Sequence, residues 1–95
     1  MNRSQIIVAI KATLKNYNIK RASLFGSFAR NEKKYNDIDV AIDPPAGFTL
    51  LDLVDVETDL KKKIKKKVEI VTFKSLSPYL KPYIKKDLVV LYEGR

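Results

Sequence analysis

Two residue types that serve much of the common catalytic and metal-binding chemistry are missing from this chain of 95 residues, which has no cysteine and no histidine. Without cysteine there are no disulfides and no thiolate nucleophile, and without either residue the usual zinc ligands and a histidine general base are excluded. Any metal ion must then be held by carboxylates and water. The lack of cysteine also fits a reducing cytoplasm.

Long hydrophobic runs are absent as well. The apolar stretch Gln5–Ile10 is too short to span a membrane, is followed by Lys11, and has no small-residue cleavage pattern. An apolar share of 45% is ordinary for a globular protein. The sequence therefore predicts a single domain over residues 1–95, located in the cytoplasm and without membrane contact.

The positive charge of the chain is concentrated in one place. Nineteen basic and eleven acidic residues give a net charge of +8, and six of the lysines lie within Lys61–Lys67. Such a run can attract nucleic acid, an acidic protein surface or ATP. The simpler interpretation is a solvated helix end, where lysines complement the helix dipole.

The spacing of apolar residues predicts the order helix, two strands, helix, strand, helix, strand. Ser4 is expected to cap the first helix, and Leu50 and Val54 are expected on the inward side of the second. This order predicts an α/β (α+β) fold, a small mixed β-sheet with helices packed on one face. The helices are expected over 3–16, 49–63 and about 75–86, with a helical turn over 28–30, and the strands over 19–25, 37–42, 68–73 and 88–92.

Two aspartates mark the second predicted strand. Side chains alternate between the faces of a strand, so Asp37 and Asp39 project together while Ile38 and Val40 project to the other side. Two carboxylates held side by side repel each other, which raises one pKa or recruits a cation. Mg²⁺ is the natural cation, because it takes one or two carboxylates together with substrate phosphates.

A glycine-serine turn precedes these aspartates. Gly26 has no Cβ, so its backbone can approach a ligand closely, and Ser27 offers an N–H and a hydroxyl where a helical turn begins. Such N–H groups favour phosphate, although a plain strand-to-helix turn explains the same residues. Arg30 either reaches a phosphate or pairs with Glu32 or Asp37.

Glu69 is the candidate for a third carboxylate. It alternates with Val68 and Ile70, which predicts that it faces away from the core. If its strand pairs beside the strand of Asp37 and Asp39, Glu69 can face the same metal ion. The alternative is a surface glutamate on a half-exposed strand.

The segments Gly26–Arg30, Asp37–Val40 and Val68–Val71 together resemble the minimal nucleotidyltransferases, the smallest members of the DNA-polymerase-beta-like superfamily. The resemblance covers nearly the whole chain. It implies a polymerase-beta-like core, Mg²⁺ as cofactor and ATP as co-substrate. It also implies catalytic and metal-binding roles for Asp37, Asp39 and Glu69, and nucleotide-binding roles for Gly26, Ser27 and Arg30.

The resemblance further implies a partner. Many such small proteins are similar to antitoxins paired with a HEPN-domain ribonuclease toxin, in which AMP moves from ATP onto a tyrosine of the toxin and silences it. We therefore expect an adenylyltransferase that forms a hetero-oligomer with a HEPN toxin and does not bind nucleic acid directly. One alternative is a weakly catalytic antitoxin that acts by occlusion. Another is nucleotide addition to RNA, supported only by the lysine run.

Three positions depart from the family pattern. Asn31 stands where glycine is usual, nine residues rather than ten separate Ser27 from Asp37, and Glu69 stands where aspartate is more usual. The extra methylene of Glu69 shifts its carboxylate, and a misplacement on the order of 1 Å can cost about 100-fold in rate. These departures are expected to affect the rate rather than the fold.

Overall fold

The computed structural model of the protein describes residues 1–35, 37–76 and 81–94. Its centre is a four-stranded sheet in the order β3-β2-β1-β4. β1 runs antiparallel to β2 and β4, and β2 runs parallel to β3, so the sheet is mixed as the sequence predicts. The strands are β1 (Arg21–Phe25), β2 (Asp37–Asp43), β3 (Lys67–Thr72) and β4 (Val89–Glu93).

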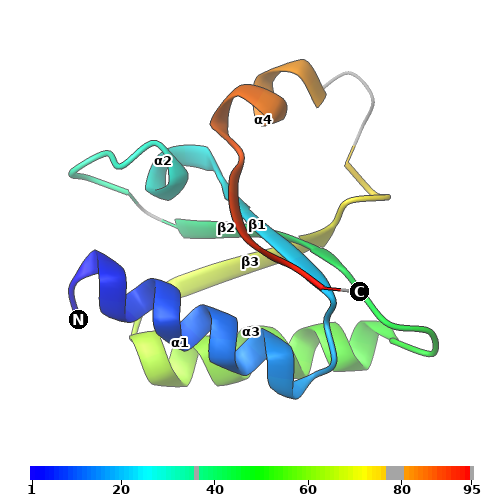
Figure 1. Cartoon of the computed structure of the whole chain (residues 1–95). Helices are drawn as coiled ribbons and strands as arrows, with labels where there is room; N and C mark the ends of the chain where they lie inside the picture. The colour runs from blue at the N-terminus through cyan, green and yellow to red at the C-terminus, as the bar shows by residue number, and fades with distance from the viewer. Residues whose placement is uncertain (36, 77–80, 95) are drawn as a thin grey trace.

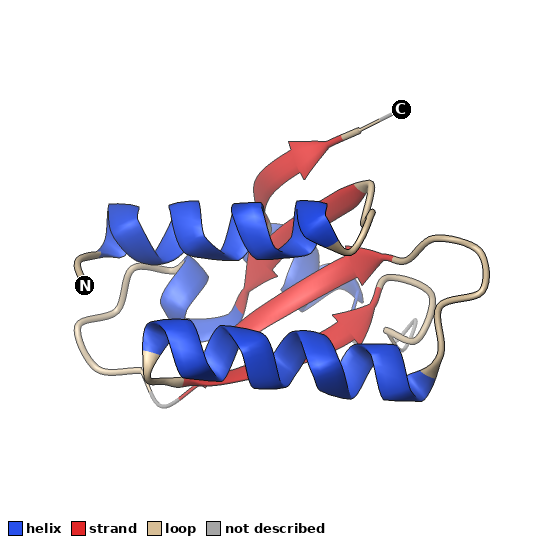
Figure 2. Cartoon of the chain, turned by 90° about the horizontal axis from the view of Figure 1, so that it is seen from below, coloured by secondary structure: helices blue, strands red, loops and turns tan. Residues whose placement is uncertain are grey.

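Helices lie on both sides of this sheet. The long helices α1 (Arg3–Asn16) and α3 (Leu50–Ile64) cover one face, and the short helices α2 (Gly26–Ala29) and α4 (Lys81–Asp87) lie on the opposite side (Figures 1 and 2). The predicted α+β class is confirmed. The prediction that the helices pack on one face of the sheet holds for the two long helices but not for the two short ones. None of the described helices is both long and apolar enough to cross a lipid bilayer.

The first helix begins with a different cap from the expected one. Asn2, not Ser4, is the N-cap residue. The Asn2 side chain accepts a hydrogen bond from the Gln5 N–H at 2.8 Å, and the Gln5 side chain accepts one from the Asn2 N–H at 2.9 Å. This reciprocal pair satisfies two backbone donors, which Ser4 within the first turn could not do.

The inward side of α3 also differs from the prediction. Leu50 and Val54 are 82% and 53% exposed, whereas Val56, Leu60 and Ile64 are buried. These three follow one another at four-residue steps and form a continuous stripe. Val54 precedes Val56 by two residues, about 200° around the helix, so it faces outward when Val56 faces the sheet.

The hydrophobic core fills the space between the sheet and the two long helices. Every second residue of β2 contributes to it, since Ile38, Val40 and Ile42 have no exposed surface. Residues 77–80 of the predicted final helix lie outside the described part of the chain, and the helix is described from Lys81. The remaining core side chains include Ile6, Ile10, Leu14, Leu24, Phe28, Val56, Leu60, Val68, Ile70 and Leu91.

Candidate active site

The pairing of β2 with β3 sets the three acidic residues on one face of the sheet. The two strands are parallel, with Asp37 opposite Lys67 and Asp39 opposite Glu69. Val68 of β3 is buried on the core side, so the residues on either side of it face away from the core. The condition stated for Glu69 is met, because its strand pairs beside the strand of Asp37 and Asp39, and the acidic face is the one opposite α1 and α3.

Gly26 lies directly against Asp39. Phe25 ends β1 opposite Asp39, so the chain turns over the Asp39 side chain at the next residue. Gly26 has a φ of +76°, and a Cβ at this position would lie 2.3 Å from Asp39 Oδ2. A Cβ at this position would overlap the carboxylate unless the Asp39 side chain moved, and the positive φ itself favours glycine.

The environment of Asp39 disfavours its charged form. Burial raises the pKa of Asp39 above its ordinary value, and the negative charges of Glu69 and Asp37 raise it further. Arg30 and Lys67 act in the opposite direction but do not cancel the rise. Asp39 is therefore a carboxylate that a cation or a proton stabilises.

Helix α2 begins at the glycine-serine turn, and Arg3 of α1 contacts it. The Arg3 guanidinium donates to the carbonyl oxygens of Phe28 and Ala29 and lies 4.5 Å from the centre of the Phe28 ring. The Phe28 ring is buried and meets Tyr35 edge-to-face at 4.9 Å. These contacts fix the position of Ser27, which is half-buried at the start of α2.

Arg30 contacts two carboxylates. Its Nε donates to Glu32 at 2.6 Å, and its Nη1 donates to Asp87 at the end of α4 at 2.7 Å. These hydrogen bonds raise the pKa of Arg30 above its ordinary value. Of the pairings expected from the sequence, the structure has the one with Glu32, and Asp87 takes the place of Asp37.

The backbone conformation of Asn31 explains why this residue can stand where glycine is usual in the family. Its φ is 61°, in the left-handed region where glycine is favoured. Asparagine is among the few other residues that adopt this conformation readily, because its short polar side chain tolerates it. The turn after α2 therefore keeps its left-handed geometry without glycine.

The donor set on the acidic face suits Mg²⁺ together with a nucleotide. Within residues 1–35, 37–76 and 81–94, no three acidic side chains lie close enough to hold one ion by themselves. Mg²⁺ usually takes only one or two protein carboxylates and completes its shell with substrate phosphates and water. Asp37 and Asp39 supply that number of carboxylates, and the backbone of Gly26 lies directly against the Asp39 carboxylate.

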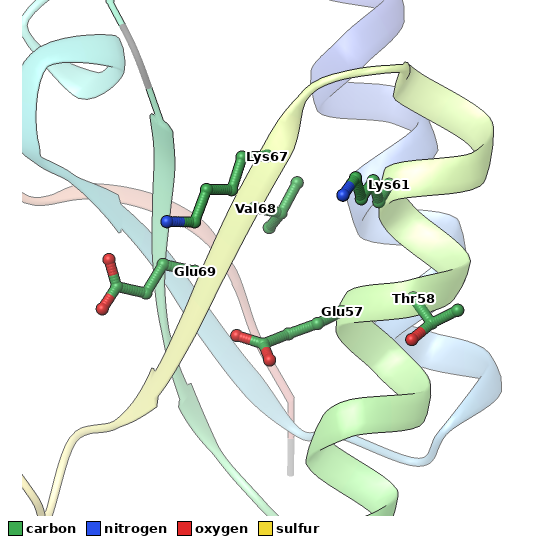
Figure 3. A pocket seen from close by; sticks show the side chains of 6 residues that line it. All are labelled: Glu57, Thr58, Lys61, Lys67, Val68 and Glu69. Atoms are coloured by element: carbon green, nitrogen blue, oxygen red, sulfur yellow. The ribbon is translucent and has the colours of Figure 1, made fainter.

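A hollow of about 370 Å³ lies along the outer edge of β3, between this strand and α3 (Figure 3). Glu57 closes part of this edge, since its carboxylate accepts a hydrogen bond from the Ile70 N–H at 2.9 Å. Lys67 and Glu69 border the hollow, but their side chains extend toward β2 and the acidic face (Figure 3). The hollow is therefore beside the acidic residues rather than over them.

Lys67 is the residue of the acidic face that the sequence analysis missed. Its Nζ lies 4.0 Å from Asp37 Oδ2. In the sequence it is the last lysine of a run that is explained by the end of α3. The alternation of side chains along a strand could have identified it. Lys67 precedes Glu69 by two residues and therefore shares its face of the strand.

A mixed sheet that sets a glycine-serine turn against an acidic strand defines a class of protein, the nucleotidyltransferases with a polymerase-beta-like core. The chain belongs to the polymerase beta nucleotidyltransferase family, which matches residues 9–95. It is 40% identical over 90 residues to "Putative protein adenylyltransferase MJ0435" of Methanocaldococcus jannaschii, covering 94% of this chain and 97% of the relative. A second protein of that organism, "Putative protein adenylyltransferase MJ0126", is 38% identical over 77 residues, 79% of each chain.

Solved structures share the fold. One described as "Structure of putative minimal nucleotidyltransferase" has a TM-score of 0.77 and 25% identity, with 94% of this chain and 95% of that chain covered. A toxin-antitoxin crystal structure with AMP-PNP has a TM-score of 0.79 at 20% identity, covering 94% and 74%. A complex of a tri-AMPylated HEPN toxin of Shewanella oneidensis with MNT antitoxin has a TM-score of 0.77 at 18% identity, covering 98% and 74%. The resemblance to minimal nucleotidyltransferases is confirmed.

Proposed function

We propose that this chain is a Mg²⁺-dependent protein adenylyltransferase that transfers AMP from ATP to a tyrosine of a HEPN ribonuclease toxin, and so acts as its antitoxin. The contact between Gly26 and Asp39 carries the proposal, because it sets the glycine-serine turn directly against a carboxylate whose charge a cation would stabilise. Relatives named as protein adenylyltransferases support the reaction. The fold shared with toxin-antitoxin complexes supports the choice of partner.

Five of the candidate site residues have a role in this proposal. Gly26 and Ser27 bind the triphosphate through the backbone, at the start of a helix where N–H groups are available. Asp37 and Asp39 would hold the metal, and Glu69 is the third acid beside them. When bound, Mg²⁺ supplies charge neutralisation and orientation of the phosphates.

The transfer forms a bond between the tyrosine oxygen and the α-phosphorus of ATP and breaks the bond from that phosphorus to the bridging oxygen, so that pyrophosphate leaves. A carboxylate must accept the tyrosine proton, because the chain has no histidine. Asp39 and Glu69 lie opposite each other in the sheet and are the candidates for this base. Much of the rate acceleration would come from holding the tyrosine oxygen and the α-phosphorus in the right relative position.

Intact-mass spectrometry of the HEPN protein encoded beside this chain, after co-expression, tests the proposal. Wild type is expected to add a nucleotide-sized mass to a toxin tyrosine, and Asp39→Asn is expected to add none. Asp43→Asn is the matched control, since Asp43 lies at the far end of the same strand and pairs with Arg21 at 3.7 Å. An unmodified toxin that both forms silence equally would leave occlusion as the mechanism.

A further inference from the structure

Lys67 is a basic side chain on the same face of the sheet as the three acidic residues, and it shares strand β3 with Glu69. It stands opposite Asp37 in the parallel pairing and two residues before Glu69. Figure 3 shows the Lys67 and Glu69 side chains extending to the same side of β3, whereas Glu57 and Lys61 belong to α3 on the other side. A ligand that lies on the acidic face is therefore within reach of the Lys67 ammonium group.

The positive charge of Arg30 is neutralised in this structure, whereas that of Lys67 is only loosely paired. Arg30 holds Glu32 and Asp87 at 2.6 and 2.7 Å. Lys67 approaches Asp37 only to 4.0 Å, and its side chain remains 68% exposed. Lys67 can thus leave its carboxylate for a phosphate at little cost, while Arg30 would have to give up two short hydrogen bonds.

A triphosphate on this face needs such a cation. The acidic residues Asp37, Asp39 and Glu69 lie on one face, so each phosphate of a nucleotide bound there that lay away from the metal would meet like charge. A lysine ammonium is a compact charge on a flexible stem and is well suited to bind phosphate oxygens.

The length of the strand indicates which phosphates Lys67 reaches. The α-phosphorus must lie beside Asp39 and Glu69 if one of them accepts the proton of the attacking hydroxyl. Lys67 lies two residues further toward the start of β3, about 6.6 Å along a parallel strand. A phosphate chain that runs from Asp39 toward the start of β2 would therefore bring its outer phosphates to Lys67.

We propose that Lys67 binds the phosphates beyond the α-phosphorus and holds the pyrophosphate as it leaves. The inference rests on the proposed function, because it assumes that the chain binds ATP on its acidic face. It assigns the cationic contact to Lys67 of β3 rather than to Arg30 of α2. It also predicts that Lys67 contributes to the binding of a nucleoside triphosphate but not to the binding of AMP, which lacks the outer phosphates.

Isothermal titration calorimetry with two ligands, each in Mg²⁺ buffer, tests this role. The ligands are α,β-methylene-ATP, which cannot transfer AMP, and AMP itself. Lys67→Gln is expected to weaken binding of the triphosphate about tenfold and to leave AMP binding unchanged. Lys67→Arg is expected to restore most of the affinity. Lys66→Gln is the matched control, because Lys66 is the adjacent lysine and its ammonium lies 5.2 Å from the Tyr35 ring.

The possible results separate this inference from the proposed function. Equal triphosphate affinity in wild type and Lys67→Gln would overturn the inference and leave the proposed function intact. Equal weakening of triphosphate and AMP binding would also overturn it, since Lys67 would then act only through Asp37. Absence of triphosphate binding in the wild type would overturn the proposed function and the inference together.

Discussion

Gly26 and Asp39 approach each other so closely that a methyl group on Gly26 would lie 2.3 Å from the Asp39 carboxylate oxygen. The contact joins the turn proposed to bind phosphate to the strand proposed to bind the metal. Both the fold and the proposed reaction depend on it, and substitutions at the two positions test it separately.

Gly26→Ala is expected to destabilise the protein by roughly 1–3 kcal/mol through backbone strain and by more through the overlap with Asp39. Gly47→Ala is the matched control, because Gly47 has a φ of +82° but no heavy atom within 4 Å of its added Cβ. Urea unfolding of both variants measures the difference. Equal losses would mean that the Asp39 carboxylate moves aside freely.

Asp39→Asn is expected to raise the melting temperature at pH 7 in metal-free buffer, because burial and neighbouring charges raise the pKa of Asp39. A raised pKa means that the folded state binds a proton more tightly than the unfolded state. Wild-type stability therefore falls as the pH rises from the ordinary value of 3.8 through the folded-state pKa. Thermal unfolding at pH 3 and pH 7 measures this, and a gain at pH 7 that persists at pH 3 contradicts the electrostatic cause.

Mg²⁺ with α,β-methylene-ATP is expected to raise the wild-type melting temperature, and the chelator EDTA is expected to reverse the rise. A ligand present at 100 times its dissociation constant stabilises the folded state by about 2.7 kcal/mol. The double variant Asp37→Asn/Asp39→Asn should lose the effect of Mg²⁺, and Asp43→Asn should keep it. Differential scanning fluorimetry measures all three proteins, and a full response of the double variant would place the metal elsewhere.

Asn31→Val is expected to destabilise the turn after α2 by roughly 1–2 kcal/mol, because a β-branched residue is strained at a φ of 61°. Asn31→Gly is expected to be neutral or slightly stabilising, since glycine adopts this conformation without strain. Chemical denaturation of both variants is the measurement. A tolerated valine would show that the turn readily adopts another conformation.

Arg30→Gln is expected to loosen α4, because Arg30 joins Asp87 of this helix to the loop after α2. Amide hydrogen exchange in residues 81–87 should accelerate, while exchange in β2 should not change. Asp87→Asn should accelerate exchange in the same helix. If α4 exchanges at the wild-type rate in both variants, packing rather than the ion pair holds this helix.

Short-range periodicity was enough to predict much of this site. The period of two in β2 and β3 placed Asp37 and Asp39 on one face and Val68 on the other, and the parallel pairing put Glu69 opposite Asp39. The helix over Arg3–Asn16 was also predicted with its observed bounds. These features depend on residues that are neighbours along the chain or on the two faces of one strand.

Contacts between distant segments were not predictable in this way. Arg30 meets Asp87 across 57 positions, and no local pattern indicates that α4 returns to α2. The inward side of α3 was also predicted wrongly at Leu50 and Val54, because its first turns contain more apolar residues than the sheet covers. Lys67 was overlooked because it ends a run whose other lysines belong to α3 and the turn that follows it.

The alternation of side chains in the two parallel strands has an evolutionary consequence. Even-numbered positions, such as Ile38 and Val68, lie in the core, and odd-numbered positions, such as Asp39 and Lys67, lie on the acidic face. A mutation that alters the acidic face therefore falls on a different codon from one that alters the packing of the core. A lineage with this architecture can change its acidic face by point mutation while it inherits the hydrophobic half unchanged.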